Sequence, residues 1–233
     1  TGVEDDNGDN TTVDAEIANK TDVVLTSVAG NESSIGYVSL GSLNDTVKAV
    51  KVDGVEATTD NVKSGDYKLS RPFNIATKGE PTGVAKDFIN FILSADGQAI
   101  VEEEGYSTVN EAAGAVAADG CVGQVAVGGY SAGAPGMEKL IEAYQAVTPK
   151  AKIELQTSDS TSGMTGAIDG TFAIGMASRE LKDEEKAELT GTSIALDGIA
   201  VVVNPNNTVE DLTMDQIKSI YIGETTDWAD VAA

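Results

Sequence analysis

Two glycine-bearing turns carry the residues whose types and spacing best suit ligand chemistry. The first runs from Gly128 to Pro135 (GGYSAGAP) and the second from Thr157 to Gly163 (TSDSTSG), and each separates a predicted strand from a predicted helix. In an open α/β sheet such turns present hydroxyls and helix N-terminal N–H groups to small oxyanions without adding charge. We expect both turns to converge on one spot. Capping of the following helices by the same Ser and Thr side chains is the alternative.

Other reactive residues favour binding over catalysis. Gly129 to Gly133 has the G-x-S-x-G pattern of serine hydrolases, but the chain has no histidine to serve as the base. The lack of histidine and the single Cys121 exclude a histidine-based triad, a His-ligated zinc site and an intrachain disulfide. We therefore expect no catalytic residue, no metal and no cofactor. Cys121 is interpreted as an incidental or buried thiol, with an attachment point as the alternative.

Composition narrows the class of partner. The 233 residues include 38 acidic and 15 basic ones, for a formal charge of −23. Nucleic acid is disfavoured because phosphate neutralisation needs clustered Lys and Arg, and only Arg71 and Arg179 are arginines. Arg179 is expected to hold a neighbouring carboxylate. No apolar run approaches a membrane span, and residues 1–6 lack a signal-peptide pattern, so we expect a soluble chain without membrane insertion.

The elements that must position the turns follow from periodicity and turn residues. The acidic segment 4–10 predicts a solvated loop rather than a calcium loop. A hairpin is expected over 47–55 around Asp53-Gly54, and a helix should break at Gly97. Residues 110–120 are expected to form a connector, and Trp228 is expected to pack against its neighbours. The β-α-β-α-β order from 124 to 203 predicts an α/β fold with a parallel, doubly wound sheet. Helices are expected over 14–29, from 82, and over 137–147, 163–169, 182–189 and 213–220, and strands over 35–40, 71–76, 124–128, 151–156, 172–176 and 194–203.

Several segments together resemble the phosphate-binding proteins of bacterial phosphate ABC importers. Segments similar to the first half of that family are 158–163, 174–181 (IGMASREL), 195–205 (ALDGIAVVVNP) and 226–228, and those similar to its second half are 35–43 (IGYVSLGSL), 67–78 and 85–105. The second-half segments come first here. The resemblance therefore implies a circular permutation, engineered, in which the connector over 110–120 joins the old ends.

The resemblance implies a two-lobed periplasmic-binding-protein (flytrap) fold that binds phosphate or another small ligand between its lobes without catalysis. Lobe 1 would be residues 79–204, and lobe 2 residues 1–78 with 205–233. The implied partner is an ABC permease. The implied location of the family is extracytoplasmic, either in the periplasm or on the cell surface as a lipoprotein. This chain is expected to be soluble, and it could be a recombinant form. The resemblance implies ligand contacts at Ser131, Ala132, Ser162, Gly163 and Ala173. Two aromatic residues, Tyr130 and Phe172, are expected to shape the pocket together with Ala173.

The chain departs from the family pattern at two places. Ala173 stands where the family usually carries an Asp, and a strand with a phosphate loop expected after Val231 is not in the sequence, so the second lobe is expected to be incomplete. The pocket could have been recut for another small molecule, the cut could be an attachment point in a reporter or scaffold, or the loop could lie outside this sequence. A ligand-free scaffold, reporter or interaction module is the alternative function.

Overall fold

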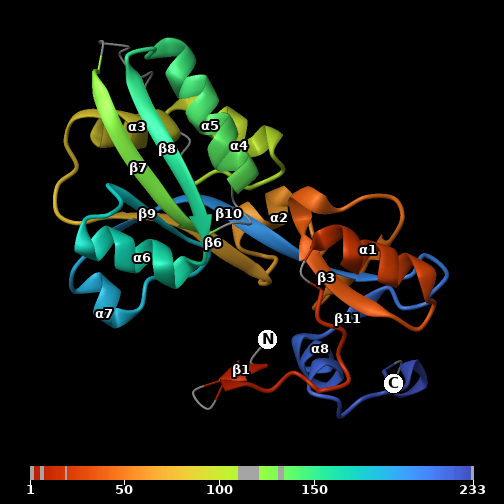
Figure 1. Ribbon diagram of the computed structural model, residues 1–233. Helices are drawn as coiled ribbons and strands as arrows, with labels where there is room; N and C mark the ends of the chain where they lie inside the picture. The colour runs from red at the N-terminus through yellow and green to blue at the C-terminus, as the bar shows by residue number, and fades with distance from the viewer. Residues whose placement is uncertain (1–2, 6–7, 19, 110–120, 131–133, 232–233) are drawn as a thin grey trace. The chain divides into compact units, whose positions relative to one another are not determined.

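The computed structural model describes residues 3–5, 8–18, 20–109, 121–130 and 134–231 (Figure 1). The expected connector over 110–120 and the site candidates Ser131 and Ala132 lie outside these residues. The described chain divides into unit 1, Thr1–Ser70 with Gly198–Ala233, and unit 2, Arg71–Asp197. The sequence analysis placed the corresponding boundaries at 78/79 and 204/205.

Unit 2 contains β6 (Ser70–Thr77), β9 (Ile174–Ala177), β7 (Gly123–Tyr130) and β8 (Ala151–Ser158) in that order, and the first part of β10 (Thr190–Val203) lies beside β6. β7 pairs parallel with both β8 and β9, whereas β6 pairs antiparallel with β9. The predicted α/β class is confirmed, but the sheet is mixed rather than wholly parallel. Parallel pairing needs a crossover helix between the strands, and such helices join β7, β8 and β9 only.

Helices cover both faces of this sheet, as expected for a doubly wound arrangement (Figure 1). On one face α3 (Gly83–Ile92) and α5 (Ala134–Val147) bury Phe88 and Tyr144 completely, against Val127 of β7. On the other face α6 (Ser160–Asp169) buries Met164 and Ala167. Two further helices in the described part of this unit are α4 (Ala95–Glu103) and α7 (Asp183–Lys186).

The break between α3 and α4 falls earlier than predicted. It lies at Leu93 and Ser94, where Ser94 Oγ accepts a hydrogen bond from Gly97 N at 3.2 Å and caps α4. Gly97 itself lies inside α4. A Cβ there would come within 2.1 Å of Phe91 O, so the glycine permits close packing and does not end a helix.

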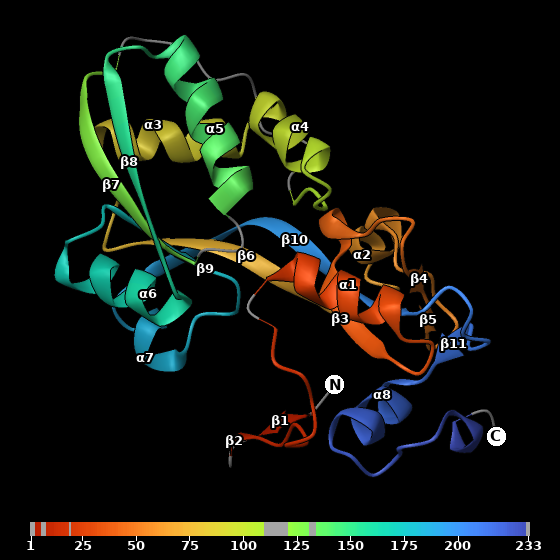
Figure 2. The same cartoon turned by 45° about the vertical axis from the view of Figure 1, so that its right-hand side comes forward.

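In unit 1, β10 (Thr190–Val203) pairs antiparallel with β3 (Ile35–Ser39) and β4 (Lys48–Ala49). Helix α1 (Thr21–Gly30) lies along β3 (Figure 2), and a Cβ on Gly36 would meet the Val24 and Val28 side chains within 3 Å. The helix begins seven residues later than the predicted Asp14. The apolar residue Ile17, which suggested the earlier start, is 88% exposed and contributes nothing to a core.

The rest of unit 1 consists of short elements. The predicted turn at Asp53-Gly54 forms, with Val52 N donating to Val55 O at 2.9 Å, but β5 (Lys51–Val52) pairs parallel with β11 (Asp211–Leu212) and makes no long hairpin. The acidic segment predicted as a loop contains the hairpin of β1 (Glu4–Asp5) and β2 (Gly8–Asp9). Two helices, α2 (Thr59–Ser64) and α8 (Met214–Tyr221), and two 3-10 turns, Leu40–Ser42 and Trp228–Asp230, complete the unit.

Two sequence predictions at the end of the chain concern single side chains. The sequence offers Thr213 or Asp211 as the cap of α8, and Thr213 is the cap, because its Oγ accepts from Gln216 N at 3.1 Å while Gln216 Oε1 accepts from Thr213 N at 2.8 Å. Trp228 Nε1 donates to Ser33 O at 3.0 Å, which ties the end of the chain to the turn before β3. Among the described residues, none of the helices is both long enough and apolar enough to span a bilayer.

Candidate functional site

The two glycine-bearing turns meet at the carboxyl ends of the parallel strands of unit 2. A Cβ on Gly163, in the first turn of α6, would lie 2.8 Å from Gly129 Cα and 2.5 Å from Met176 O. Gly129 has φ of 133°, a backbone conformation that favours glycine. The expectation that both turns converge is therefore confirmed for their described residues. Glycine is needed at both positions because two backbones touch there.

The second turn is organised by a carboxylate. Asp159 Oδ1 accepts from Ser162 N at 2.9 Å, and Asp159 Oδ2 accepts from Ser162 Oγ at 2.6 Å. Gly163 N donates to Asp159 O at 3.0 Å. These hydrogen bonds from Ser162 lower the pKa of Asp159. Ser162 thus serves as part of a helix cap, and the Asp159 carboxylate takes the place at the α6 N-terminus where an external anion would bind.

The chain leaving β9 brings more hydroxyls and a cation to this edge. Ser178 N donates to Ser160 Oγ at 3.1 Å, and Arg179 Nη2 lies 3.4 Å from Thr161 Oγ1. Arg179 also binds Glu185 through two hydrogen bonds of 2.8 Å, so the predicted carboxylate partner of Arg179 is confirmed. These hydrogen bonds raise the pKa of Arg179 and lower that of Glu185.

The end of β7 carries an aromatic cluster with a second arginine. The Tyr130 and Phe73 rings lie 5.3 Å apart, and the Arg71 guanidinium lies 5.5 Å from the Tyr130 ring and 5.7 Å from the Phe73 ring. Burial raises the pKa of Tyr130, and the positive charge of Arg71 opposes part of this shift. Sequence reasoning did not identify Arg71 as a site residue. The sequence signal that could have identified Arg71 is the alternation of side chains along β6, which puts Arg71 and Phe73 on one face of the strand.

Phe172 and Ala173 lie at the opposite end of β9 from the turns. The Phe172 ring lies against Gly128 and Gly166, where a Cβ on either glycine would come within 2.3 Å of it. Ala173 is exposed, and its N–H donates to Ala126 O at 2.9 Å, three residues before Gly129 on β7. The structure thus brings Gly163 against Gly129, the neighbour of Tyr130, whereas Phe172 contacts the first turn at Gly128 and Ala173 pairs with Ala126 earlier on β7. Cys121 is half-buried against the core of unit 2.

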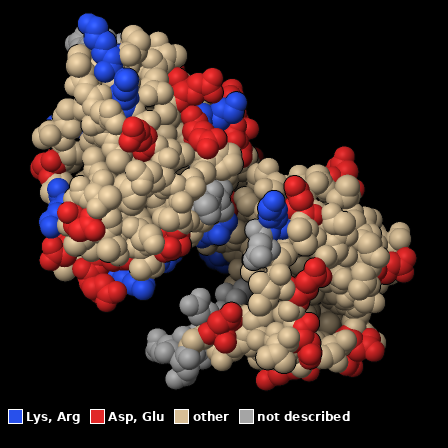
Figure 3. Space-filling view, viewed as in Figure 1, with Lys and Arg blue, Asp and Glu red and all other residues tan. Residues whose placement is uncertain are grey.

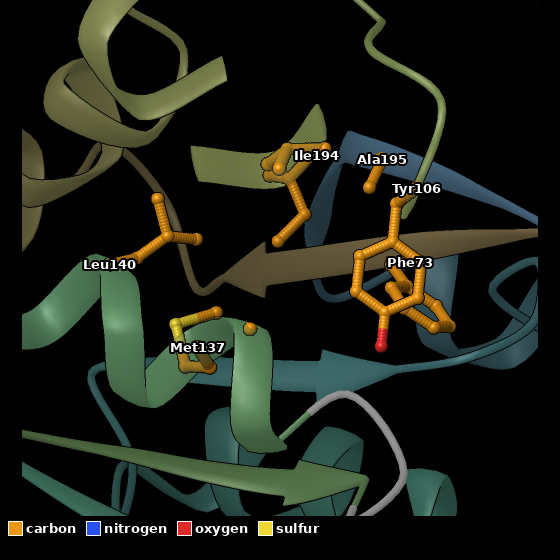
Figure 4. Close-up of a pocket in the computed structure, with 8 residues that line it drawn as sticks. Phe73, Tyr106, Met137, Leu140, Ile194 and Ala195 are labelled. Atoms are coloured by element: carbon orange, nitrogen blue, oxygen red, sulfur yellow. The ribbon is translucent and has the colours of Figure 1, made fainter. Parts of the chain in front are cut away.

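A small cavity lies behind the first turn of α5 (Figure 4). Its volume is about 20 Å³, and Phe73, Tyr106 and Met137 are among the side chains that line it. Such a volume holds one water molecule at most, so this cavity is no ligand site. Burial raises the pKa of Tyr106 to about 12.

Charge at the surface is dominated by acids. On the face drawn in Figure 3, basic side chains lie in small separate groups among acidic ones. Within the described ranges, no group of three or more Cys, Asp or Glu side chains is arranged to hold a metal ion. Two arginines, Arg71 and Arg179, lie near the turns of unit 2, and each binds a carboxylate.

Comparison with known proteins gives consistent matches. A family model described as a PBP superfamily domain matches residues 4–96 and 114–233. The chain is 51% identical over 226 residues to the phosphate-binding protein PstS 2 of Streptococcus agalactiae, covering 96% of this chain and 77% of that protein. It is 40% identical over 220 residues to PstS 2 of Streptococcus pneumoniae, covering 94% and 76%. A crystal structure of a phosphate-binding protein of a phosphate ABC transporter from Streptococcus pneumoniae superposes with a TM-score of 0.91 at 39% identity, covering 99% of this chain and 91% of that one.

Proposed function

Because the chain belongs to the PBP superfamily and, within it, to the PstS family of phosphate-binding proteins, we propose that it binds phosphate or another small ligand at the carboxyl edge of the unit 2 sheet. The chain is a solute-binding protein and not an enzyme. The ligand would lie by the turn that follows Tyr130 and by the α6 N-terminus, with Ser131 and Ala132 as expected contacts.

The convergence of both arginines on this edge carries the proposal. Arg71 reaches the end of β7 from β6, and Arg179 follows directly on β9 and reaches the first turn of α6. A chain of formal charge −23 repels anions on the whole, so binding of phosphate needs local positive charge and aligned N–H dipoles. This edge places two guanidinium groups near the turns, and each of them also binds a carboxylate, Asp197 for Arg71 and Glu185 for Arg179.

Asp159 sets the strength of that binding. Its carboxylate accepts both donors of Ser162, and its negative charge stands beside the position proposed for the ligand. A phosphate ion would have to compete with it for the same helix terminus. The proposal therefore expects weak binding in the unaltered chain and tighter binding once this charge is removed.

Calorimetric titration with inorganic phosphate tests the proposal on the unaltered chain, Asp159→Asn and Asp169→Asn. Asp159→Asn keeps an oxygen to cap α6 and should tighten phosphate binding about threefold to tenfold. Asp169→Asn is the matched control, because Asp169 is an exposed acid at the other end of α6 whose carboxylate accepts from Thr171 N at 2.8 Å. Heat from none of the three proteins would overturn the proposal and favour a ligand-free scaffold.

We further infer that the two halves of the family sequence stand in exchanged order. The support for this is that the family model matches in two segments, 4–96 and 114–233, and the break between them, residues 97–113, overlaps the first residues of the expected connector at 110–120. A gene that places residues 114–233 before residues 1–109 should yield a chain with the same circular dichroism spectrum and thermal unfolding midpoint. An unfolded product would count against the exchange. An engineered origin of this order stays a prediction.

The proposed partner is the permease of a phosphate ABC importer, on the extracytoplasmic side of the membrane. The name of the Streptococcus pneumoniae structure, a phosphate ABC transporter phosphate-binding protein, supports this assignment. Addition of the phosphate-loaded chain to importer-containing proteoliposomes should stimulate ATP hydrolysis. Hydrolysis at the rate of the importer alone, with phosphate binding intact, would remove the permease from the proposal.

A further inference from the structure

Unit 1 contains a pocket that the proposed phosphate site does not use. Its volume is about 410 Å³, within the range of small-molecule sites, and its lining residues all belong to unit 1. One wall is the face of the sheet that α1 leaves uncovered, with Tyr37 of β3 and Ile199 and Val201 of β10. The facing wall is α8, with Ile217 and Tyr221.

These two walls are apolar and aromatic, and the polar residues Asp9, Thr11, Lys68 and Ser70 line other parts of the pocket. Val201 and Ile217 are each 1% exposed, so the pocket reaches down to core side chains. At its mouth Tyr37 is 59% exposed, a high value for a large aromatic side chain, and its ring meets the Tyr221 ring edge-on with the centroids 5.7 Å apart. Exposed aromatic rings above buried aliphatic side chains favour binding of a ligand with a flat ring system.

One polar group in this wall lacks a partner. The Tyr221 hydroxyl is buried and makes no hydrogen bond among the described residues. A buried hydroxyl without a partner is costly, and a ligand in the pocket that carries an acceptor could satisfy it. The main chain of Tyr221 is fixed meanwhile, because its O accepts from Thr12 N at 2.8 Å.

Among the residues that line the pocket, Lys68 carries a positive charge and Asp9 a negative one. Lys68 Nζ donates to Gly65 O, and the Asp9 carboxylate, which also lines the pocket, accepts from Thr11 N and Thr11 Oγ1 at 2.9 and 2.6 Å. An anionic ligand would meet the Asp9 charge on top of the net charge of the chain. We propose that this pocket binds an uncharged aromatic molecule that carries a hydrogen-bond acceptor, independently of any phosphate in unit 2.

Prodan, a neutral naphthalene with a ketone acceptor and an environment-sensitive fluorescence, is the probe for the test. The unaltered chain should give a saturable fluorescence increase with one site per chain. Ile199→Trp fills the pocket and should weaken binding at least about tenfold, whereas Val147→Trp adds the same indole at an exposed position of unit 2 and should leave it unchanged. Excess inorganic phosphate should not displace the dye.

Further variants keep the test decisive if Ile199→Trp fails to fold. Tyr37→Ala removes an exposed aromatic ring and should weaken prodan binding severalfold. Tyr221→Phe should also weaken prodan binding, and it should leave the thermal unfolding midpoint unchanged because the Tyr221 hydroxyl makes no hydrogen bond within the described chain. Three results would overturn the proposal: no saturable binding, equal binding by every folded variant, or tighter binding of anionic anilinonaphthalene sulfonate than of prodan. Dimer formation through Tyr37, detected by light scattering and abolished by Tyr37→Ala, would replace the ligand with a second copy of the chain.

Discussion

The Arg71 guanidinium binds the carboxylate of Asp197, which is completely buried, with Nη2 and Nε at 2.8 and 2.9 Å from Oδ2. These two residues are the first and the last of unit 2. The ion pair therefore joins the two points at which the chain enters and leaves that unit, and it also places the arginine beside Tyr130.

Removal of this arginine should destabilise the protein strongly. Arg71→Ala takes the ion-pair partner from a buried carboxylate, which should cost about 3 kcal/mol of the free energy of unfolding in urea titrations. Lys186→Ala, which breaks an exposed pair with Asp183 at 3.8 Å, should cost less than about 0.5 kcal/mol. Similar losses for the two variants would show that burial of Asp197 does not govern the energy of the pair.

The contact between the two turns should make Gly163 intolerant of any side chain. Gly163→Ala would press a methyl group on Met176 O and Gly129 Cα and should lower stability by about 1–3 kcal/mol. Gly30→Ala is the control, since a Cβ at this helical position has no neighbour within 4 Å and should leave stability unchanged or slightly raised. Equal thermal midpoints for the two variants would contradict the close approach of the turns.

Acid should weaken the Arg179–Glu185 pair in a defined pH window. The hydrogen bonds from Arg179 hold the pKa of Glu185 below its ordinary value, so its stabilising contribution is present above about pH 4.3 and is lost as the pH falls through the lowered pKa. The stability difference between the unaltered chain and Glu185→Gln should be constant from about pH 7 to 5 and shrink below about pH 4. Glu188→Gln, an exposed neighbour, controls for net charge. A difference that persists at full size in acid would refute this assignment.

High pH should destabilise the folded protein through its buried tyrosines. Burial raises the pKa of Tyr67 and of Tyr106 to about 12, so both remain neutral in the folded state where an unfolded chain would ionise near pH 10. The stability that this difference provides is complete below about pH 10 and is lost as the pH rises through about 12. Ultraviolet titration measures the ionisation of the tyrosines, and circular dichroism recorded over the same pH range measures unfolding. Ionisation of every tyrosine near pH 10 with the fold intact would disprove it.

Periodicity predicted most elements of unit 2 because their apolar residues do face a core. The helix and strand cores over 137–147, 151–156 and 194–203 are present, each somewhat longer than predicted. Tertiary pairing was harder to predict. The Asp53-Gly54 turn forms as its residues require, yet its flanking strand pairs with Leu212, a partner about 160 positions away that no local pattern reveals.

The candidate site was predictable in position but not in chemistry. Strand-to-helix glycines located the turns, since only glycine fits where Gly129 and Gly163 touch. The sequence could not decide whether Ser162 meets a ligand or a cap, because that depends on the conformation of Asp159 three residues earlier. Arg71 was missed because it is distant in sequence from both turns and comes close to Tyr130 only through the order of strands in the sheet.

The chain passes between its two units within strands and not through loops. β6 crosses at Ser70 and Arg71, β10 crosses at Asp197 and Gly198, and Ile199 N donates to Leu69 O at 2.8 Å beside the crossing. A cut at either crossing would divide β6 or β10 within its length and leave each half with a truncated strand. Dissection into separately expressed halves is therefore a poor strategy for this protein, even though each half has a core of its own.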